Sequence, residues 1–204
     1  MKNKSLVWVL TIIGGFVFIS GFLGGCTAIE NESTSGTRLI IESITGTDLE
    51  GNDNSTTVFS DVITTSGSIF NDNATAVLRA VLLEPFREAE STSEYQQVIV
   101  DQIDISYSRT DGLNVEGKDI PYSFSQKVNT IVFINETTNL SFVVVQHNAK
   151  GESPLVELMN YPNQEHVLKM EAQITFYSRD LGGHRLTPVT GSLSIWFGNF
   201  GDED

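Results

Sequence analysis

The stretch VLKMEAQITFY, residues 167–177, alternates between apolar and polar side chains along its length. Successive side chains of a β-strand point to opposite faces of a sheet, so this period of two predicts a strand with one dry face and one wet face. The side chains expected inside are Leu168, Met170, Ala172, Ile174 and Phe176, and those expected outside are Lys169, Glu171, Gln173, Thr175 and Tyr177.

The same period of two recurs on both sides of this stretch. In residues 192–197 it places Leu193, Ile195 and Phe197 inward. Further strands are expected at residues 38–44, 57–64, 75–84, 95–108, 128–134 and 139–147, which brings the number to about eight. Turn-forming residues separate them, and no long helical period occurs. The sequence therefore predicts an all-β fold, an antiparallel β-sandwich over residues 38–204.

One short helix is expected within this all-β region, at residues 154–160. Ser153 is placed to cap it, Pro154 suits the first helical position, and Glu157 falls in the first turn.

The bulk composition describes one acidic domain. The chain has 204 residues, of which 40% are hydrophobic, so a core of ordinary size is available without disulfide bonds or a metal. Its formal net charge of -14 argues against nucleic acid as a partner, because binding a phosphate backbone depends on Lys and Arg. Its one cysteine, Cys26, cannot form a disulfide within the chain.

The first 26 residues have the layout of an export signal. A lysine-containing start is followed by an uncharged apolar run, residues 6–23, which ends in the sequence LGGC at residues 23–26. These four residues resemble the lipobox of bacterial lipoproteins, in which an aliphatic residue and two small ones precede a cysteine. The resemblance implies that Cys26 receives a lipid and that residues 1–25 are removed as a signal peptide. Acyl chains would then anchor the protein, since each buried methylene contributes about 0.8 kcal/mol.

Two other interpretations of the leader stay open. The apolar run is 18 residues long, which is just enough to cross a bilayer as an uncleaved anchor, and a plain secretory signal is the other alternative. In each case Lys2 and Lys4 favour the cytoplasmic side, so the rest of the chain lies outside. Residues 26–37 are expected to be the lipidated cysteine and a polar tether. The predicted location is membrane-anchored and extracytoplasmic, in a bacterial envelope.

Two segments near the C-terminal end resemble the closing hairpin of immunoglobulin-like domains in bacterial envelope proteins. They are ITFYSRDLGGH, residues 174–184, and WFGNFG, residues 196–201. More loosely, the whole exported part resembles a group of uncharacterised bacterial lipoproteins. These resemblances imply an immunoglobulin-like sandwich in the envelope, but no activity. The cysteine pair and core tryptophan pattern of antibody domains are missing, so the likeness concerns architecture.

The sequence has no recognisable catalytic motif, cofactor motif or metal-ligand spacing. Its three histidines, His147, His166 and His184, are each expected as a partly exposed strand or turn residue. Neither a GxSxG nucleophile elbow nor a Ser-x-x-Lys pair occurs, and phosphate-binding loops of the usual kinds are absent.

Carboxylate clusters are the remaining candidates for a site. The loop DLEGNDN, residues 48–54, and the end GDED, residues 201–204, carry oxygen ligands that calcium prefers, but the spacing of an EF-hand is absent and a solvated loop is expected. Asp101 and Asp104, three residues apart on a strand, are expected to point to opposite faces, which disfavours a shared glycosidase-like site. Asn-x-Ser/Thr sequons begin at Asn31, Asn54, Asn73, Asn135 and Asn139 and matter only in a cell that glycosylates asparagine.

These features predict a non-enzymatic envelope protein that binds or scaffolds another protein or a glycan. The alternatives are an envelope enzyme acting on carbohydrate and a calcium-dependent binding module. The membrane, reached through lipid on Cys26, is the one partner that the sequence specifies.

Overall fold

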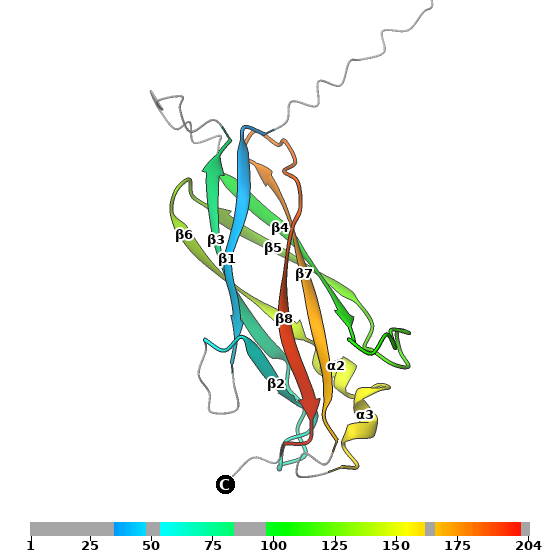
Figure 1. The fold of residues 1–204 in the computed structure, drawn as a ribbon. Coiled ribbons are helices and arrows are strands. Elements are labelled where there is room, and N and C mark those ends of the chain that lie inside the picture. Colours follow the sequence, from blue (N-terminus) through cyan, green and yellow to red (C-terminus); the bar gives the residue numbers. More distant parts are fainter. Residues whose placement is uncertain (1–34, 48–53, 84–96, 162–165, 201–204) are drawn as a thin grey trace, which may run out of the picture. The chain divides into compact units, whose positions relative to one another are not determined.

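Two β-sheets packed face to face make up the fold (Figure 1). The computed structural model describes residues 35–47, 54–83, 97–161 and 166–200. One sheet has the order β1 (Thr37–Gly46), β3 (Asp72–Leu82), β6 (Thr137–Val145). The other has the order β2 (Thr57–Asp61), β8 (Val189–Gly198), β7 (Leu168–Asp180), β4 (Val98–Ser108), β5 (Phe124–Val132). The predicted all-β sandwich is confirmed, and each expected strand is present within a few residues of its expected ends.

Strand β7 has the register that its sequence predicts. Ile174 and Phe176 are completely buried, whereas Thr175 between them is partly exposed. The strand lies between β8 and β4 in the five-stranded sheet, so its inward row of side chains forms one wall of the core.

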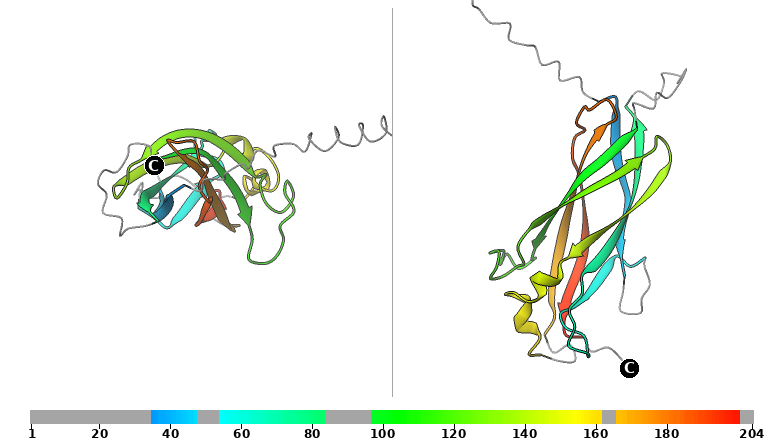
Figure 2. Two further views of the ribbon diagram at one scale, coloured as in Figure 1. Left: turned by 90° about the horizontal axis from the view of Figure 1, so that it is seen from above. Right: turned by 180° about the vertical axis from the view of Figure 1, so that it is seen from behind.

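Contacts between the two sheets fix the distance between the layers, which Figure 2 shows end-on. The ring of Phe142 in β6 meets the ring of Phe176 in β7 edge-on, with centroids 5.8 Å apart. The Tyr107 hydroxyl of β4 donates a hydrogen bond of 2.7 Å to the Val144 carbonyl oxygen of β6. Burial raises the pKa of Tyr107 far above its usual value, so the hydroxyl keeps its proton and remains a donor.

One strand pair is parallel in this mainly antiparallel sandwich. β2 runs parallel to β8, with Val58 opposite Ile195. The chain passes from one sheet to the other between β1 and β2, and two hydrogen bonds between Gly46 and Ser55, of 2.8 and 3.0 Å, close this crossing. A Cβ atom at residue 46 would lie 2.2 Å from Val58 Cγ2, so the crossing requires glycine.

Two short helices, α2 (His147–Lys150) and α3 (Leu155–Leu158), follow β6. α3 corresponds to the helix expected at residues 154–160 but is shorter. Ser153 does not cap it, because Pro154 occupies the N-cap position and the Ser153 hydroxyl donates to Glu157 Oε1 at 3.3 Å. The sequence does not predict α2, since a single helical turn leaves no measurable period. Within the described ranges, no helix is long and apolar enough to span a bilayer.

The two open sides of the sandwich differ. On one side, the Gln126 side chain of β5 bonds both the carbonyl oxygen and the N–H of Val143, at 2.8 and 3.3 Å, and so occupies the free edge of β6. On the other side, β2 pairs only with the second half of β8, Ser194–Gly198. The first half of β8 therefore faces β1 with no described strand between them.

Candidate functional site

A groove of about 730 Å³ lies on this second open side. Its walls are Ser35, the start of β1 (residues 37–40), Leu83 just after β3, the loop residues 185–187 and Val189 at the start of β8. Pockets for small ligands have volumes of about 300–1,000 Å³, so the groove has room for a ligand.

Two arginines, Arg38 and Arg185, line this groove beside aliphatic side chains such as Leu39, Leu83 and Leu186. Both arginines are exposed. Neither guanidinium group forms an ion pair in the part of the chain that the structure describes. The chain has only 12 basic residues against 26 acidic ones, so two arginines in one groove distinguish it from a chain that is acidic overall.

The turn between β7 and β8 holds Arg185 beside the groove. Asp180 Oδ1 accepts a hydrogen bond of 2.8 Å from the His184 backbone N–H, and His184 Nδ1 lies 3.1 Å from Asp180 Oδ2. Burial raises the pKa of Asp180, but the hydrogen bonds from His184 and from the Ser35 hydroxyl lower the pKa by more than burial raises it. The pKa of Asp180 therefore lies below its usual value of 3.8. The ionised carboxylate fixes the turn, and Arg185 follows it directly.

The other two histidines have structural contacts. His147 lies beside Asn71, whose Oδ1 accepts the His147 backbone N–H at 2.7 Å. The His166 ring packs on Tyr161, with centroids 4.1 Å apart. All three histidines are exposed, as the sequence predicts. Among the described residues, no three His, Cys, Asp or Glu side chains are grouped as a metal site would require.

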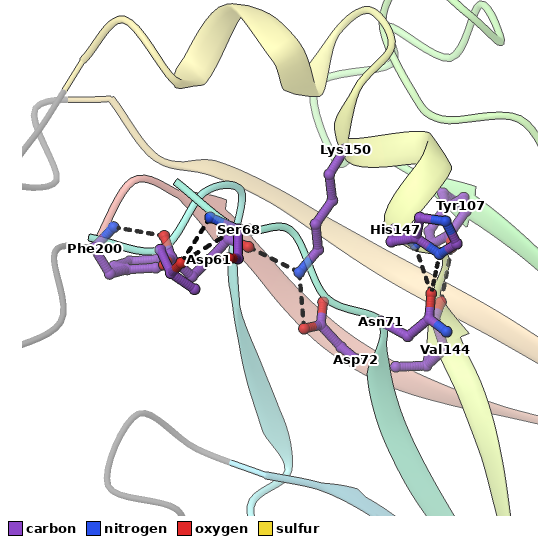
Figure 3. A network of polar contacts seen from close by, with 10 residues as sticks. Asp61, Ser68, Asn71, Asp72, Tyr107, Val144, His147, Lys150 and Phe200 are labelled. Atoms are coloured by element: carbon purple, nitrogen blue, oxygen red, sulfur yellow. Dashed lines mark hydrogen bonds and ion pairs between the residues drawn. The ribbon is translucent and has the colours of Figure 1, made fainter. Parts of the chain in front are cut away.

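A buried polar cluster lies where α2 meets β2 and β3 (Figure 3). Lys150 is only 1% exposed, and its Nζ donates to the Asp61 carbonyl oxygen at 2.8 Å and to Asp72 Oδ1 at 2.9 Å. Asp61 Oδ1 accepts the Phe200 N–H at 3.1 Å. No sequence motif indicates this cluster, because its members come from four separate segments.

Asp101 and Asp104 lie on the same face of β4, contrary to the prediction. Asp101 Oδ2 is 3.6 Å from Arg179 Nε, and Asp104 is hydrogen-bonded to Tyr177; both partners lie on the outer face of β7. A β-bulge directly after Val100 shifts the register against both neighbouring strands. The extra residue breaks the strict alternation on which the prediction relied.

The surface beside Asp104 does not have the make-up of a glycosidase site. A shallow pocket of about 360 Å³ there has Asp104 as the one carboxylate among its described lining residues. Burial raises the pKa of Asp104, but hydrogen bonds with Ser125, Gln102 and Tyr177 lower the pKa by more than burial raises it. The pKa of Asp104 is therefore lower than usual. A general acid needs a raised pKa and a second carboxylate nearby.

Several predicted features fall outside the described residues: the leader 1–25, the lipidation site Cys26, Asn31, residues 48–53 of the acidic loop and residues 201–204. The asparagines of the other four sequons, Asn54, Asn73, Asn135 and Asn139, are exposed.

Comparison with protein-family models and with curated proteins finds no match to this chain.

Proposed function

We propose that this chain is a lipid-anchored, non-catalytic binding module on the outer face of a bacterial membrane, and that its ligand binds in the groove between β1 and β8. The observation that carries the proposal is the pair of guanidinium groups, Arg38 and Arg185, which form no ion pair with any described residue and lie beside aliphatic walls in a protein of net charge -14. Arginine binds carboxylates and phosphates through paired hydrogen bonds. The ligand is thus an anionic amphiphile, with its acidic group on the arginines and its hydrocarbon part on the leucines.

The membrane is the source of this ligand. Nine residues of chain lead from Cys26 to Ser35 at the groove wall. A chain of that length reaches at most about 32 Å when fully extended. Lipidation of Cys26 would therefore keep the groove within reach of lipids in the bilayer to which the protein is anchored.

Other partners fit the groove less well. A neutral glycan would leave both guanidinium groups without a counter-charge, although charge-assisted hydrogen bonds are the strongest that the groove offers. A carbohydrate-cleaving enzyme would need two carboxylates in one cleft, and the pocket beside Asp104 contributes one among its described lining residues.

The immunoglobulin-like architecture is a second part of the proposal, and the strand order supports it. With β1, β3 and β6 as strands A, B and E, the three-stranded sheet has the order A-B-E. With β8, β7, β4 and β5 as strands G, F, C and C′, the second sheet has the order G-F-C-C′ of a variable-type domain. In this scheme β2 is the second part of strand A, transferred to the other sheet.

Binding of the anionic fluorophore anilinonaphthalene sulfonate tests the groove. We expect residues 27–204 to bind the dye and dodecanoate to displace it. The double variant Arg38→Gln, Arg185→Gln should weaken binding tenfold or more, because a hydrogen bond to a charged group contributes about 1.5–3 kcal/mol.

The matched control is the double variant Arg79→Gln, Lys127→Gln, which removes two positive charges outside the groove; Arg79 pairs with Glu42, and Lys127 contacts Gln102. Equal dye affinity in both double variants and the parent would contradict the proposal.

A further inference from the structure

Lys150 and Asp72 lie 78 positions apart in the chain and meet inside the fold (Figure 3). Lys150 Nζ is 2.9 Å from Asp72 Oδ1. The lysine is 1% exposed, and Asp72 Oδ2 is also buried and makes no hydrogen bond of ordinary geometry. An amine and a carboxyl group are therefore held in contact at a largely buried place, where the Asp72 side chain is 18% exposed.

The neighbours of this pair hold it in position. The Asp61 carbonyl oxygen accepts a second hydrogen bond from Lys150 Nζ, at 2.8 Å, so the amine nitrogen is fixed from two sides. The Ser60 hydroxyl is completely buried and lies close enough to the Asp72 carboxyl to lower its pKa.

The surroundings of Asp72 favour its protonated form, because burying a carboxylate costs several kcal/mol. Burial does raise the pKa of Asp72, with a smaller contribution in the same direction from the charge of Asp61, against the opposing effect of Lys150. A carboxylic acid in contact with an amine is the reactant pair for an amide bond.

We propose that Lys150 and Asp72 form an intramolecular isopeptide bond. The lone pair of Lys150 Nζ attacks Asp72 Cγ, and a C–N bond forms. One proton passes from Nζ to the departing Asp72 oxygen, which Lys150 Nζ already contacts at 2.9 Å. The Cγ–O bond then breaks and one water molecule leaves. No redox partner or cofactor takes part, and the product is an amide between β3 and the end of α2.

Amide formation from an acid and an amine is unfavourable in water, but two features of the fold change the balance. Groups held in reacting geometry behave as if present at about 10⁵–10⁸ M. The water that leaves enters bulk solvent, whereas the amide stays in a site where Lys150 is 1% exposed. Because the chain's one cysteine excludes an internal disulfide, this bond would be its covalent cross-link. It would close a loop from β3 through to α2.

Tryptic mapping of the full chain extracted from membranes tests the bond. We expect one branched peptide, in which residues 39–79 are joined to residues 128–169, with a mass one water below the sum of its parts. Trypsin should leave residue 150 uncut, because an acylated lysine is not a substrate. Recovery of residues 39–79, 128–150 and 151–169 as separate peptides would overturn the proposal and leave a buried ion pair.

Substitutions at the two positions assign the branched peptide to this pair of side chains. Lys150→Arg and Asp72→Ala should abolish the branched peptide, and Lys127→Arg should leave it intact. Asp72→Asn should give the same branched product with loss of ammonia in place of water. If a variant fails to fold, the peptide map of the parent protein is still sufficient to show whether the bond exists, because its peptides are analysed after denaturation. The result is independent of the groove, because no dye or ligand is involved.

Discussion

Gly191 of β8 lies against Ile44 of β1, so closely that a Cβ atom at residue 191 would stand 2.6 Å from Ile44 Cδ1. The two strands belong to different sheets, and they approach each other here without pairing. This contact closes the open side of the sandwich next to the groove, whose walls end at Ile40 and Val189. The absence of a side chain at residue 191 therefore leaves room for the end of the Ile44 side chain between the two strands.

Gly191→Ala should destabilise the domain by about 1–3 kcal/mol, because the added methyl group forces Ile44 or the backbone to move. Urea unfolding of residues 27–204 measures this change. Gly36→Ala is the matched control, since a Cβ atom there meets nothing within 4 Å, and it should change stability by less than about 0.5 kcal/mol. Ile44→Val removes the clashing Cδ1 atom, so it should reduce the cost of Gly191→Ala. Additive effects of the two changes would show that they do not meet.

Phe176→Ala should cost about 3–5 kcal/mol, since the ring is completely buried and packs across the core on Phe142. Thr175→Ala, one residue away, should cost much less, because its side chain is partly exposed and its Oγ1 bonds another hydroxyl, Thr190 Oγ1, at 2.9 Å. Thermal and urea unfolding give both values. Similar losses in the two variants would be incompatible with the register of β7.

The register of β7 could be predicted because one face of that strand is buried and the other is wet, which imprints a period of two on the sequence. The bulge at Asp101 could not be predicted, because it depends on how β4 pairs with both neighbours rather than on its own residues. The parallel pairing of β2 could not be predicted either, because the five residues of this strand do not indicate whether it runs parallel or antiparallel to its neighbour. Local pattern thus determines the strands, while long-range pairing determines their irregularities.

The candidate sites were harder to predict from the sequence than the strands. Arg38 and Arg185 stand 147 positions apart, and only the packing of β1 beside β8 brings them to one groove. The one signal in the sequence is the scarcity of basic residues, which makes any two that share a surface unusual. Lys150 has no such signal at all, because burial of a lysine in a one-turn helix follows from the tertiary fold.

Cys26→Ser should yield a protein that no longer partitions with lipoproteins into a detergent phase, because serine cannot take the thioether-linked lipid. Mass spectrometry of the mature N-terminus gives the direct result. The lipobox predicts a chain that begins at a modified Cys26. A mature chain that retains Met1 and residues 2–25 would instead identify an uncleaved helical anchor.

Asp180→Asn should make the free energy of unfolding fall less steeply as the pH is lowered. The folded-state pKa of Asp180 lies below its usual value of 3.8, because the hydrogen bonds from His184 and Ser35 outweigh the opposing effect of burial. The folded protein therefore binds this proton less readily than the unfolded chain does. The resulting stabilisation is fully present above the unfolded-state pKa and is lost as the pH falls through the lower folded-state pKa.

Urea midpoints measured at several pH values between about 6 and 3 test this linkage. The parent protein should lose stability more steeply below about pH 4.5 than Asp180→Asn does, and the two curves should converge at the acid end. Thr175→Ala, which changes no ionisable group, should keep the steep slope of the parent. Parallel curves for the parent and Asp180→Asn would mean that the Asp180–His184 turn contributes nothing to acid sensitivity, and that Arg185 is held in place by other contacts.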